Sequence, residues 1–209
     1  MSRFWKTGGY EYEFKALRLP EFQDYREKEA RYLGSIIKDG STILDVGIGS
    51  GNSLRFLKGN VRIYGIDINN VMLGTARNSL DGKPKLTQAN AENIPFSKNK
   101  FDYVICTGNT YGNFENPDEC LKEMIRVVKP KGKVILGVYS EDALEVQLEL
   151  YKKIGLDVES YNEEAVYGSD DFISRRFSKE KLEDIARQHV APIEIIKLTP
   201  ISYIAILRK

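Results

Sequence analysis

The sequence has few of the residues that build metal cages and disulfide frameworks. Its 209 residues include two cysteines, Cys106 and Cys120, and one histidine, His189. These are too few for a structural zinc site made of cysteine and histidine, so we expect no metal. Both cysteines lie in apolar segments, which predicts reduced, buried thiols and a cytoplasmic protein.

The chain also lacks a long hydrophobic run and an excess of one charge. No apolar run approaches the roughly 18 residues of a membrane-spanning helix, and residues 1–9 lack a signal-peptide core, so we expect no membrane span. Lysine and arginine number 31 against 30 aspartates and glutamates, a net charge of +1. This balance provides no general field for collecting nucleic acid, which argues against a nucleic-acid partner.

Apolar strand-like segments alternate with helical ones along the chain, which predicts an α/β fold. Unbroken apolar runs such as 43–46 and 134–138 suit strands buried on both faces of a parallel sheet. The two last strands, expected at 193–198 and 202–207, are too close for a parallel crossover and must form a hairpin. The sequence therefore predicts a doubly wound, seven-stranded sheet that is mostly parallel with an antiparallel C-terminal hairpin. The other strands are expected at 42–46, 62–67, 85–88, 103–107 and 133–139, and helices at 53–57, 71–80, 118–128 and 179–188.

Two parts of the chain stand outside this alternation. We expect residues 1–39 to form an N-terminal lid, rich in aromatics and glycine, and an amphipathic helix that packs on the core. Residues 40–209 form the main domain, with an irregular, Tyr-rich insertion at about 140–178 on the substrate side. An alternative for the first segment is simple packing of its aromatic rings on the sheet edge.

A buried strand runs into a glycine-rich turn at residues 43–52. Gly47, Gly49 and Gly51 form the pattern GxGxG, in which glycine permits a sharp turn and a close approach of backbone to a ligand. A dinucleotide fingerprint needs glycine at the sixth position, which is Asn52 here. Asp67 ends the next strand, where its two oxygens can accept both hydroxyl groups of a ribose.

Several ordered segments, from about residue 40 to the C-terminal hairpin, resemble class I S-adenosylmethionine-dependent methyltransferases. In the third of these motifs, Asn90 stands where relatives often have aspartate. The resemblance implies a Rossmann-like methyltransferase fold and S-adenosylmethionine as the cofactor, with S-adenosylhomocysteine as its product. The segments that resemble the family motifs are 45–51, 65–68, 90–96, 101–105 and 127–134.

The resemblance also implies which residues hold the cofactor. The glycine turn would hold the methionyl end, with Asp45 reaching its ammonium directly or through water. Asp67 would bind the ribose, and the residues after it and after the third strand would contact the adenine. The cofactor positions implied in this way are Asp45, Gly47, Ile48, Gly49, Gly51, Asn52, Asp67, Ile68, Met72, Asn90, Ala91, Glu92 and Thr107.

Residues 107–114 follow the fourth strand on the acceptor side of the fold. They contain no [DN]-P-P-[FY], the signature of amino-methylating nucleic-acid enzymes, and their Gly-Asn-Thr resembles the loop of glycine-type small-molecule N-methyltransferases. Amides can donate and accept hydrogen bonds, an aromatic ring can face a cation, and an inward arginine would suit a carboxylate. We therefore expect Asn109 and Tyr111 as candidates for catalysis. The expected substrate-side residues are Asn109, Tyr111, Asn113, Tyr139, Arg175 and Arg176.

Taken with the resemblance, the sequence predicts methyl transfer to a small polar acceptor, an amine or a hydroxylated ring, by in-line displacement at the sulfonium methyl. Alternative acceptors are RNA and protein, and another interpretation is a cofactor-binding protein of this fold without turnover. A spermidine-synthase-like aminopropyltransferase would need carboxylates in 107–114, which has none. His189 is interpreted as a helix-end residue rather than a base. The oligomeric state is not written in the sequence.

Overall fold

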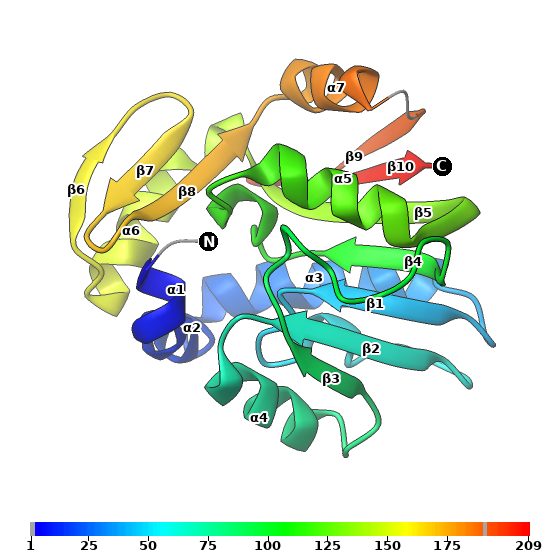
Figure 1. Cartoon of the computed structure of the whole chain (residues 1–209). Helices are drawn as coiled ribbons and strands as arrows, with labels where there is room; N and C mark the ends of the chain where they lie inside the picture. Colours follow the sequence, from blue (N-terminus) through cyan, green and yellow to red (C-terminus); the bar gives the residue numbers. More distant parts are fainter. Residues whose placement is uncertain (1–2, 190–191) are drawn as a thin grey trace.

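The computed structural model describes residues 3–189 and 192–209. At its centre five parallel strands lie in the order β3-β2-β1-β4-β5 (Figure 1). The strand order reverses between β1 and β4, and ligands bind in such sheets at the carboxyl ends of the strands beside this reversal. The five strands are β1 (Thr42–Val46), β2 (Arg62–Asp67), β3 (Lys85–Gln88), β4 (Phe101–Cys106) and β5 (Val128–Ser140).

An antiparallel hairpin extends the sheet beyond β5. It consists of β9 (Ile193–Thr199) and β10 (Ser202–Arg208), separated only by Pro200 and Ile201. Strand β10 pairs antiparallel with β5, from Ser202 opposite Tyr139 to Arg208 opposite Lys133. The predicted mostly parallel sheet with an antiparallel C-terminal hairpin is confirmed.

The insertion after β5 is more regular than the sequence predicts. It contains β6 (Val158–Tyr161), β7 (Ala165–Gly168) and β8 (Phe172–Phe177), an antiparallel meander in which β8 joins the end of β5. The described residues therefore form a connected sheet of ten strands rather than seven. Strand β6 is largely exposed and polar, so it shows no apolar run from which a strand could be predicted.

Helices cover both faces of the central sheet. The helices α3 (Pro20–Ile36) and α4 (Asn70–Ser79) pack on one face, and α5 (Pro117–Val127) and α7 (Lys179–Gln188) pack on the other. Alternate side chains of β1 point to opposite faces of the sheet. Ile43 packs on the face covered by α3 and α4, and Leu44 packs on the face covered by α5 and α7. Within the described residues, no helix is long and apolar enough to cross a bilayer.

The helix expected at 53–57 is wrong. The structure forms only a short 3₁₀ turn, η1 (Asn52–Leu54). Helix α3 passes close to this segment, so that a Cβ at Gly34 would lie 2.5 Å from the carbonyl oxygen of Phe56. Helix α3 thus packs directly against the backbone of this segment.

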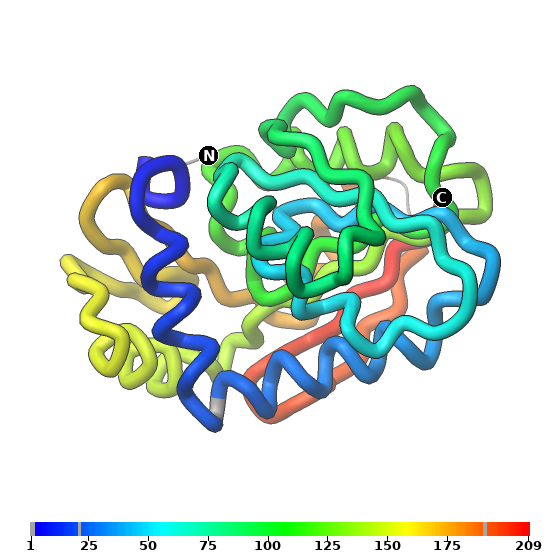
Figure 2. Tube along the Cα trace, turned by 90° about the horizontal axis from the view of Figure 1, so that it is seen from below, coloured from blue at the N-terminus to red at the C-terminus, as the bar shows by residue number. Residues whose placement is uncertain are grey.

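The N-terminal segment forms two short helices, α1 (Arg3–Thr7) and α2 (Gly9–Ala16). They lie between the strand ends and the insertion, beside β8 and helix α6 (Leu144–Ile154), as the blue tube in Figure 2 shows. The ring of Phe4 packs edge-on against Phe172 of β8, with 4.8 Å between ring centres. The backbone N–H of Phe4 donates to the carbonyl of Asp170 at 2.8 Å. We call residues 3–16 the lid.

Candidate active site

The backbone of the glycine turn after β1 adopts a conformation that glycine tolerates and other residues rarely adopt. Gly47, Gly49 and Gly51 have φ angles of 71°, 53° and 78°, in the left-handed region. A Cβ on Gly47 would overlap the side-chain methyl of Thr110. The turn is fastened to β2, because the N–H groups of Gly47 and Ile48 both donate to the carbonyl of Ile66. Glycine is therefore required at Gly47 by both backbone conformation and space.

Asp67 organises the backbone around the end of β2. Its Oδ2 accepts the N–H of Gly49 and its Oδ1 accepts the N–H of Asn69, both at 2.9 Å. Burial raises the pKa of the Asp67 carboxyl, and these backbone donors offset part of the effect. Each carboxylate oxygen retains a second lone pair, so Asp67 can fix the turn and still accept from a ligand.

Asn69 connects this corner to the lid. Its Oδ1 accepts the N–H groups of Val71 and Met72 at the start of α4, and its Nδ2 donates to the carbonyl of Trp5 at 3.2 Å. The lid is thus hydrogen-bonded to the strand tips at Trp5 and to the insertion at Phe4.

A cavity lies where the glycine turn, the strand tips and the lid meet. It encloses about 600 Å³ of space not filled by atoms, with solvent at its mouth included. The residues that line it are Trp5, Tyr10, Glu13, Arg26, Gly47, Gly49, Asp67, Ile68, Asn69, Met72, Gly108, Thr110 and Asn113.

A buried ion pair from α3 forms one wall of the cavity. Nη1 of Arg26 lies 3.4 Å from Oε2 of Glu29, and the same oxygen accepts the N–H of Gly108 at 3.0 Å. The hydroxyl of Tyr25 donates to Oε1 of Glu29 at 3.0 Å. Arg26 is 8% exposed and Glu29 1%. The pair thus places two charged side chains of α3 beside the end of β4.

The two charges of this pair depend on each other. Burial raises the pKa of Glu29, and Arg26, Tyr25 and the Gly108 N–H lower it again. Burial disfavours the charge on Arg26, but the carboxylates of Glu13 and Glu29 outweigh this and keep its pKa above the ordinary value. Arg26 therefore presents a permanent positive charge to the cavity, and its buried Nε has no hydrogen-bond partner among the described residues.

Asp45 lies beneath the glycine turn rather than in the cavity wall. It is 1% exposed, and its Oδ2 accepts a hydrogen bond from Oγ of Ser53 at 2.7 Å. Burial raises the pKa of Asp45 to about 7, and Ser53 and Arg26 act in the opposite direction. Asp45 is thus a buried acid held by a hydroxyl, and its predicted contact with an ammonium stays a prediction.

The predicted cofactor residues divide between the cavity and its surroundings. Gly47, Gly49, Asp67, Ile68 and Met72 line it. The others do not line it, and their roles stay predictions; among them the Oδ1 of Asn90 accepts the N–H of Glu92. The predicted positions outside the lining are Asp45, Ile48, Gly51, Asn52, Asn90, Ala91, Glu92 and Thr107.

Three of the expected substrate-side residues are buried and contact other parts of the protein, and their acceptor roles stay predictions. Tyr111 is 1% exposed and packs against Phe177, with 5.6 Å between ring centres, so its face is turned to the core. Tyr139 is also buried and lies against Tyr25. Asn109 is 1% exposed, and its side chain donates to Ser174 and accepts the N–H of Tyr139. These side chains connect the acceptor loop to the insertion and do not face the cavity.

The two arginines of β8 are likewise engaged by the protein. Arg175 donates to the carbonyls of Gly112 and Phe114, and Arg176 donates to Gln147 and to the carbonyl of Asn162. Neither lines the cavity. Asn113, in the short helix η2 (Tyr111–Asn113), is the expected substrate-side residue that does line it.

Sequence reasoning missed Arg26, Glu13, Glu29 and Thr110. One signal was available, since Glu29 interrupts the otherwise apolar face formed by Phe22, Tyr25, Leu33 and Ile36 on α3. A carboxylate in such a stripe needs a buried partner, and Arg26 stands one turn before it. Glu13 gave no comparable signal, because its position depends on how the lid folds back.

Residues 44–136 match the family model described as a methyltransferase domain. The matching residues include the glycine turn and Asp67. The chain is 36% identical over 125 residues to a ubiquinone/menaquinone biosynthesis C-methyltransferase of Vibrio cholerae, covering 54% of this chain and 47% of that protein. It is 36% identical over 107 residues to a demethylmenaquinone methyltransferase of Bacillus mycoides, covering 47% of this chain and 45% of that protein. The chain thus spans about half the length of the curated relatives it matches.

Solved structures, among them a methyltransferase, share the fold of this chain. A protein of Pyrococcus horikoshii aligns with a TM-score of 0.71 at 23% identity, covering 92% of both chains. The 1,6-didemethyltoxoflavin-N1-methyltransferase of Burkholderia thailandensis, solved with S-adenosylhomocysteine, aligns with a TM-score of 0.68 at 12% identity, covering 91% of this chain and 81% of that one. At these identities the likeness shows the fold.

S-adenosylmethionine, the cofactor that the sequence predicts, fits the residues that line the cavity. Asp67 offers carboxylate lone pairs for a ribose, Ile68 and Met72 offer apolar surface for an adenine, and Arg26 offers a cation for a carboxylate. The buried, unpartnered Nε of Arg26 is a donor that a carboxylate of the cofactor would satisfy.

Proposed function

We propose that the protein transfers a methyl group from S-adenosylmethionine to a small polar molecule bound beneath the lid. The observation that carries this proposal is that Gly47, Asp67 and Arg26 line the same cavity as Trp5, Tyr10 and Glu13 of the lid. The first three residues suit the cofactor, and the lid residues cover the side from which an acceptor would approach.

When bound, S-adenosylmethionine supplies a methyl group on a positively charged sulfur, whose transfer to a nucleophile breaks the carbon–sulfur bond with the electron pair going to sulfur. The chain has to hold the nucleophile in line and keep water away. Arg26 and Asp67 would fix the cofactor from opposite ends. The lid, anchored at Phe4 and Trp5, would exclude water from the reacting atoms.

A small acceptor is favoured over RNA or a protein chain by the way the lid is held. It is tied to the start of α4 by the hydrogen bond from Asn69 and to the insertion by Phe4, so a folded chain or duplex would have to displace the lid to reach the cavity. The names of the curated relatives suggest a quinone-type ring as one candidate acceptor. The lid contributes the carboxylate of Glu13 in addition to aromatic rings, and Asn113 of η2 adds an amide oxygen, which favours a polar acceptor.

The test combines binding and turnover. Calorimetry should show S-adenosylhomocysteine binding and no tighter binding of NAD, because the glycine pattern lacks the sixth-position glycine. Incubation with labelled S-adenosylmethionine and a metabolite extract should label a small product. Cofactor binding without any labelled product would favour a binding protein without turnover, and labelling of RNA or protein alone would favour a large acceptor.

A further inference from the structure

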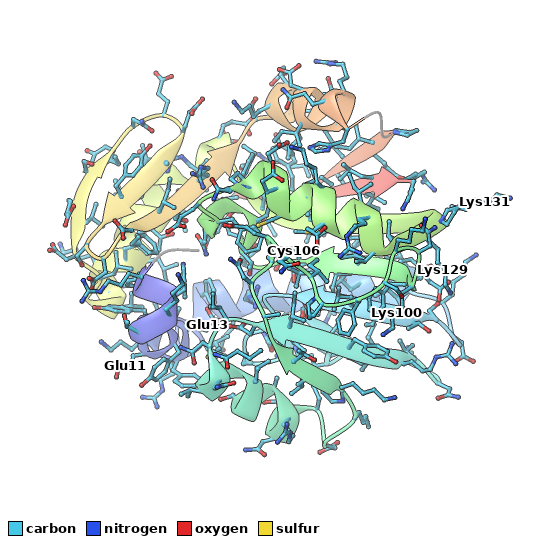
Figure 3. The ribbon with its side chains drawn as sticks, in the orientation of Figure 1. Glu11, Glu13, Lys100, Cys106, Lys129 and Lys131 are labelled. Carbon is cyan, nitrogen blue, oxygen red and sulfur yellow. The ribbon has the colours of Figure 1, made fainter. Side chains whose placement is uncertain are left out.

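Glu13 presents a carboxylate to the acceptor side of the cavity. It lies on α2 of the lid, where it faces the strand ends, while Glu11 of the same helix points outward (Figure 3). The neighbouring cation is Arg26, whose Nη2 lies 3.8 Å from Oε1 of Glu13, longer than a hydrogen bond. Within residues 3–189 and 192–209, the Glu13 carboxylate accepts no side-chain or backbone hydrogen bond. Its acceptor capacity is therefore directed at whatever enters the cavity.

The charges around Glu13 leave one negative charge over. Arg26 is paired with Glu29 at 3.4 Å, and Glu29 is almost completely buried at 1% exposure. Glu13 adds a second carboxylate to the same arginine. Two carboxylates therefore share one guanidinium, and a cation beside Glu13, from the cofactor or from the acceptor, would complete the balance.

Asn113 supplies a second acceptor atom in the same cavity. Its Oδ1 is buried and has no hydrogen-bond partner among the described residues, although the residue lines the cavity wall. Leaving such an atom unsatisfied costs about 1–3 kcal/mol. A ligand that reaches both Glu13 and Asn113 therefore has to donate at least two hydrogen bonds.

The need for two donated hydrogen bonds favours an amino group over a hydroxyl group on the ligand. A hydroxyl carries one hydrogen and can satisfy one of the two oxygens, whereas an amino group carries two or three. The rings of Trp5 and Tyr10 line the same side of the cavity, and Tyr10 lies one helical turn before Glu13. Aromatic faces attract cations and suit an amine better than a phenol or a carboxylate.

We propose that the acceptor carries an amino group, which Glu13 and Asn113 hold beneath the aromatic rings of the lid. This inference rests on the proposed methyl transfer and narrows its substrate class. The indole Nε1 of Trp5, buried and without a partner among the described residues, is a donor left for an oxygen of the same ligand. An amine that also bears a hydroxyl group would satisfy all three side chains.

The first experiment separates a metabolite extract into cationic, neutral and anionic fractions and incubates each with the protein and labelled S-adenosylmethionine. We expect the labelled product to arise from the cationic fraction. A product from only the neutral or anionic fraction would overturn the amine inference and leave the proposed function standing. No labelled product from any fraction, with S-adenosylhomocysteine binding intact, would contradict the proposed function itself.

The second experiment compares Glu13→Gln with Glu11→Gln, a matched change on the exposed side of the same helix. With the acceptor identified in the first experiment, Glu13→Gln should lower kcat/KM by about ten-fold or more through a higher KM. This is the usual effect of losing a hydrogen bond to a charged group. Calorimetric affinity for S-adenosylhomocysteine should be alike in both variants and the parent. An unchanged KM in Glu13→Gln, or a ten-fold loss of S-adenosylhomocysteine affinity in it alone, would overturn the assignment.

Discussion

Arg26 occupies the space that a side chain at position 108 would fill, since a Cβ built on Gly108 overlaps Nη1 of the arginine. The two residues are brought together by Glu29, which accepts from the Gly108 N–H and pairs with Arg26. Position 108 therefore requires glycine because α3 inserts its charged pair at the tip of β4. The cavity is built as much by this helix as by the glycine turn.

Gly108→Ala should displace Arg26 from the cavity wall. Gly108 has a φ of 65°, so alanine also strains the backbone. We expect the affinity for S-adenosylhomocysteine, measured by calorimetry, to fall by about ten-fold or more. Gly82→Ala is the matched control, because Gly82 has a φ of 70° but open space around its Cβ. Equal affinities in the two variants would mean that Arg26 does not contribute to cofactor binding.

Asp67→Ala should weaken S-adenosylhomocysteine binding by about 1.5–3 kcal/mol, the worth of hydrogen bonds to a charged group. The variant also loses the acceptors for Gly49 and Asn69, so its stability is measured in parallel by urea unfolding. Asp39→Ala provides the control, since Asp39 accepts the N–H groups of Gly40 and Asn60 in an exposed turn outside the cavity lining. An unchanged dissociation constant in Asp67→Ala would reduce Asp67 to a structural role.

Asp45 should make the protein less stable as pH rises toward neutrality. Burial raises its pKa in the folded state from 3.8 to about 7, so between these values the folded protein holds a proton that the unfolded chain has lost. The free energy of unfolding therefore falls with rising pH in this window, by up to about 1.4 kcal/mol per pH unit, and levels off above it. Glu29 and Asp67, whose pKa values are also raised by burial, add to the same trend.

The measurement is urea unfolding at several pH values between 4 and 8, which span the range from about the unfolded to above the folded pKa of Asp45. Asp45→Asn should show a shallower fall than the parent, since one titrating group is removed. Parallel curves for the two proteins would show that Asp45 stays ionised when folded.

Tyr111→Ala should unfold the protein more easily rather than act on an acceptor alone. The ring is 1% exposed and packs on Phe177 and Phe114, so its removal should cost about 3–5 kcal/mol in the free energy of unfolding. Tyr111→Phe keeps the ring and should keep both stability and turnover. A fully stable Tyr111→Ala variant that has lost turnover would restore the acceptor role that the sequence suggested.

Phe4→Ala should loosen the lid without affecting the central sheet. Phe4 contacts Phe172 and Tyr12 and is 6% exposed. We expect faster amide hydrogen exchange in residues 3–16, weaker S-adenosylhomocysteine binding and unchanged exchange in β1 and β4. Tyr161→Ala, at an exposed position of the insertion, is the control. Unchanged exchange in the lid would show that other contacts hold it.

Much of the fold could be predicted from local sequence patterns. The apolar runs of β1 and β5 indicate buried parallel strands, and the two-residue connection between β9 and β10 forces a hairpin. The glycine pattern at 47–51 and Asp67 indicate a nucleoside-containing cofactor because their chemistry is local. The meander of β6, β7 and β8 could not be predicted, since it is defined by pairing rather than by an apolar run.

The acceptor side depended on the tertiary structure. Tyr111 and Asn109 look like ligand contacts in sequence, because an aromatic ring and an amide follow a glycine after a strand. Packing of the insertion against the loop buries both of them. Glu13 and Arg26 lie in the N-terminal helices, and only the folding of these helices over the strand tips places their charges in the cavity. A sequence records which groups lie near one another along the chain, whereas a site built from contacts between distant segments is decided when those segments pack.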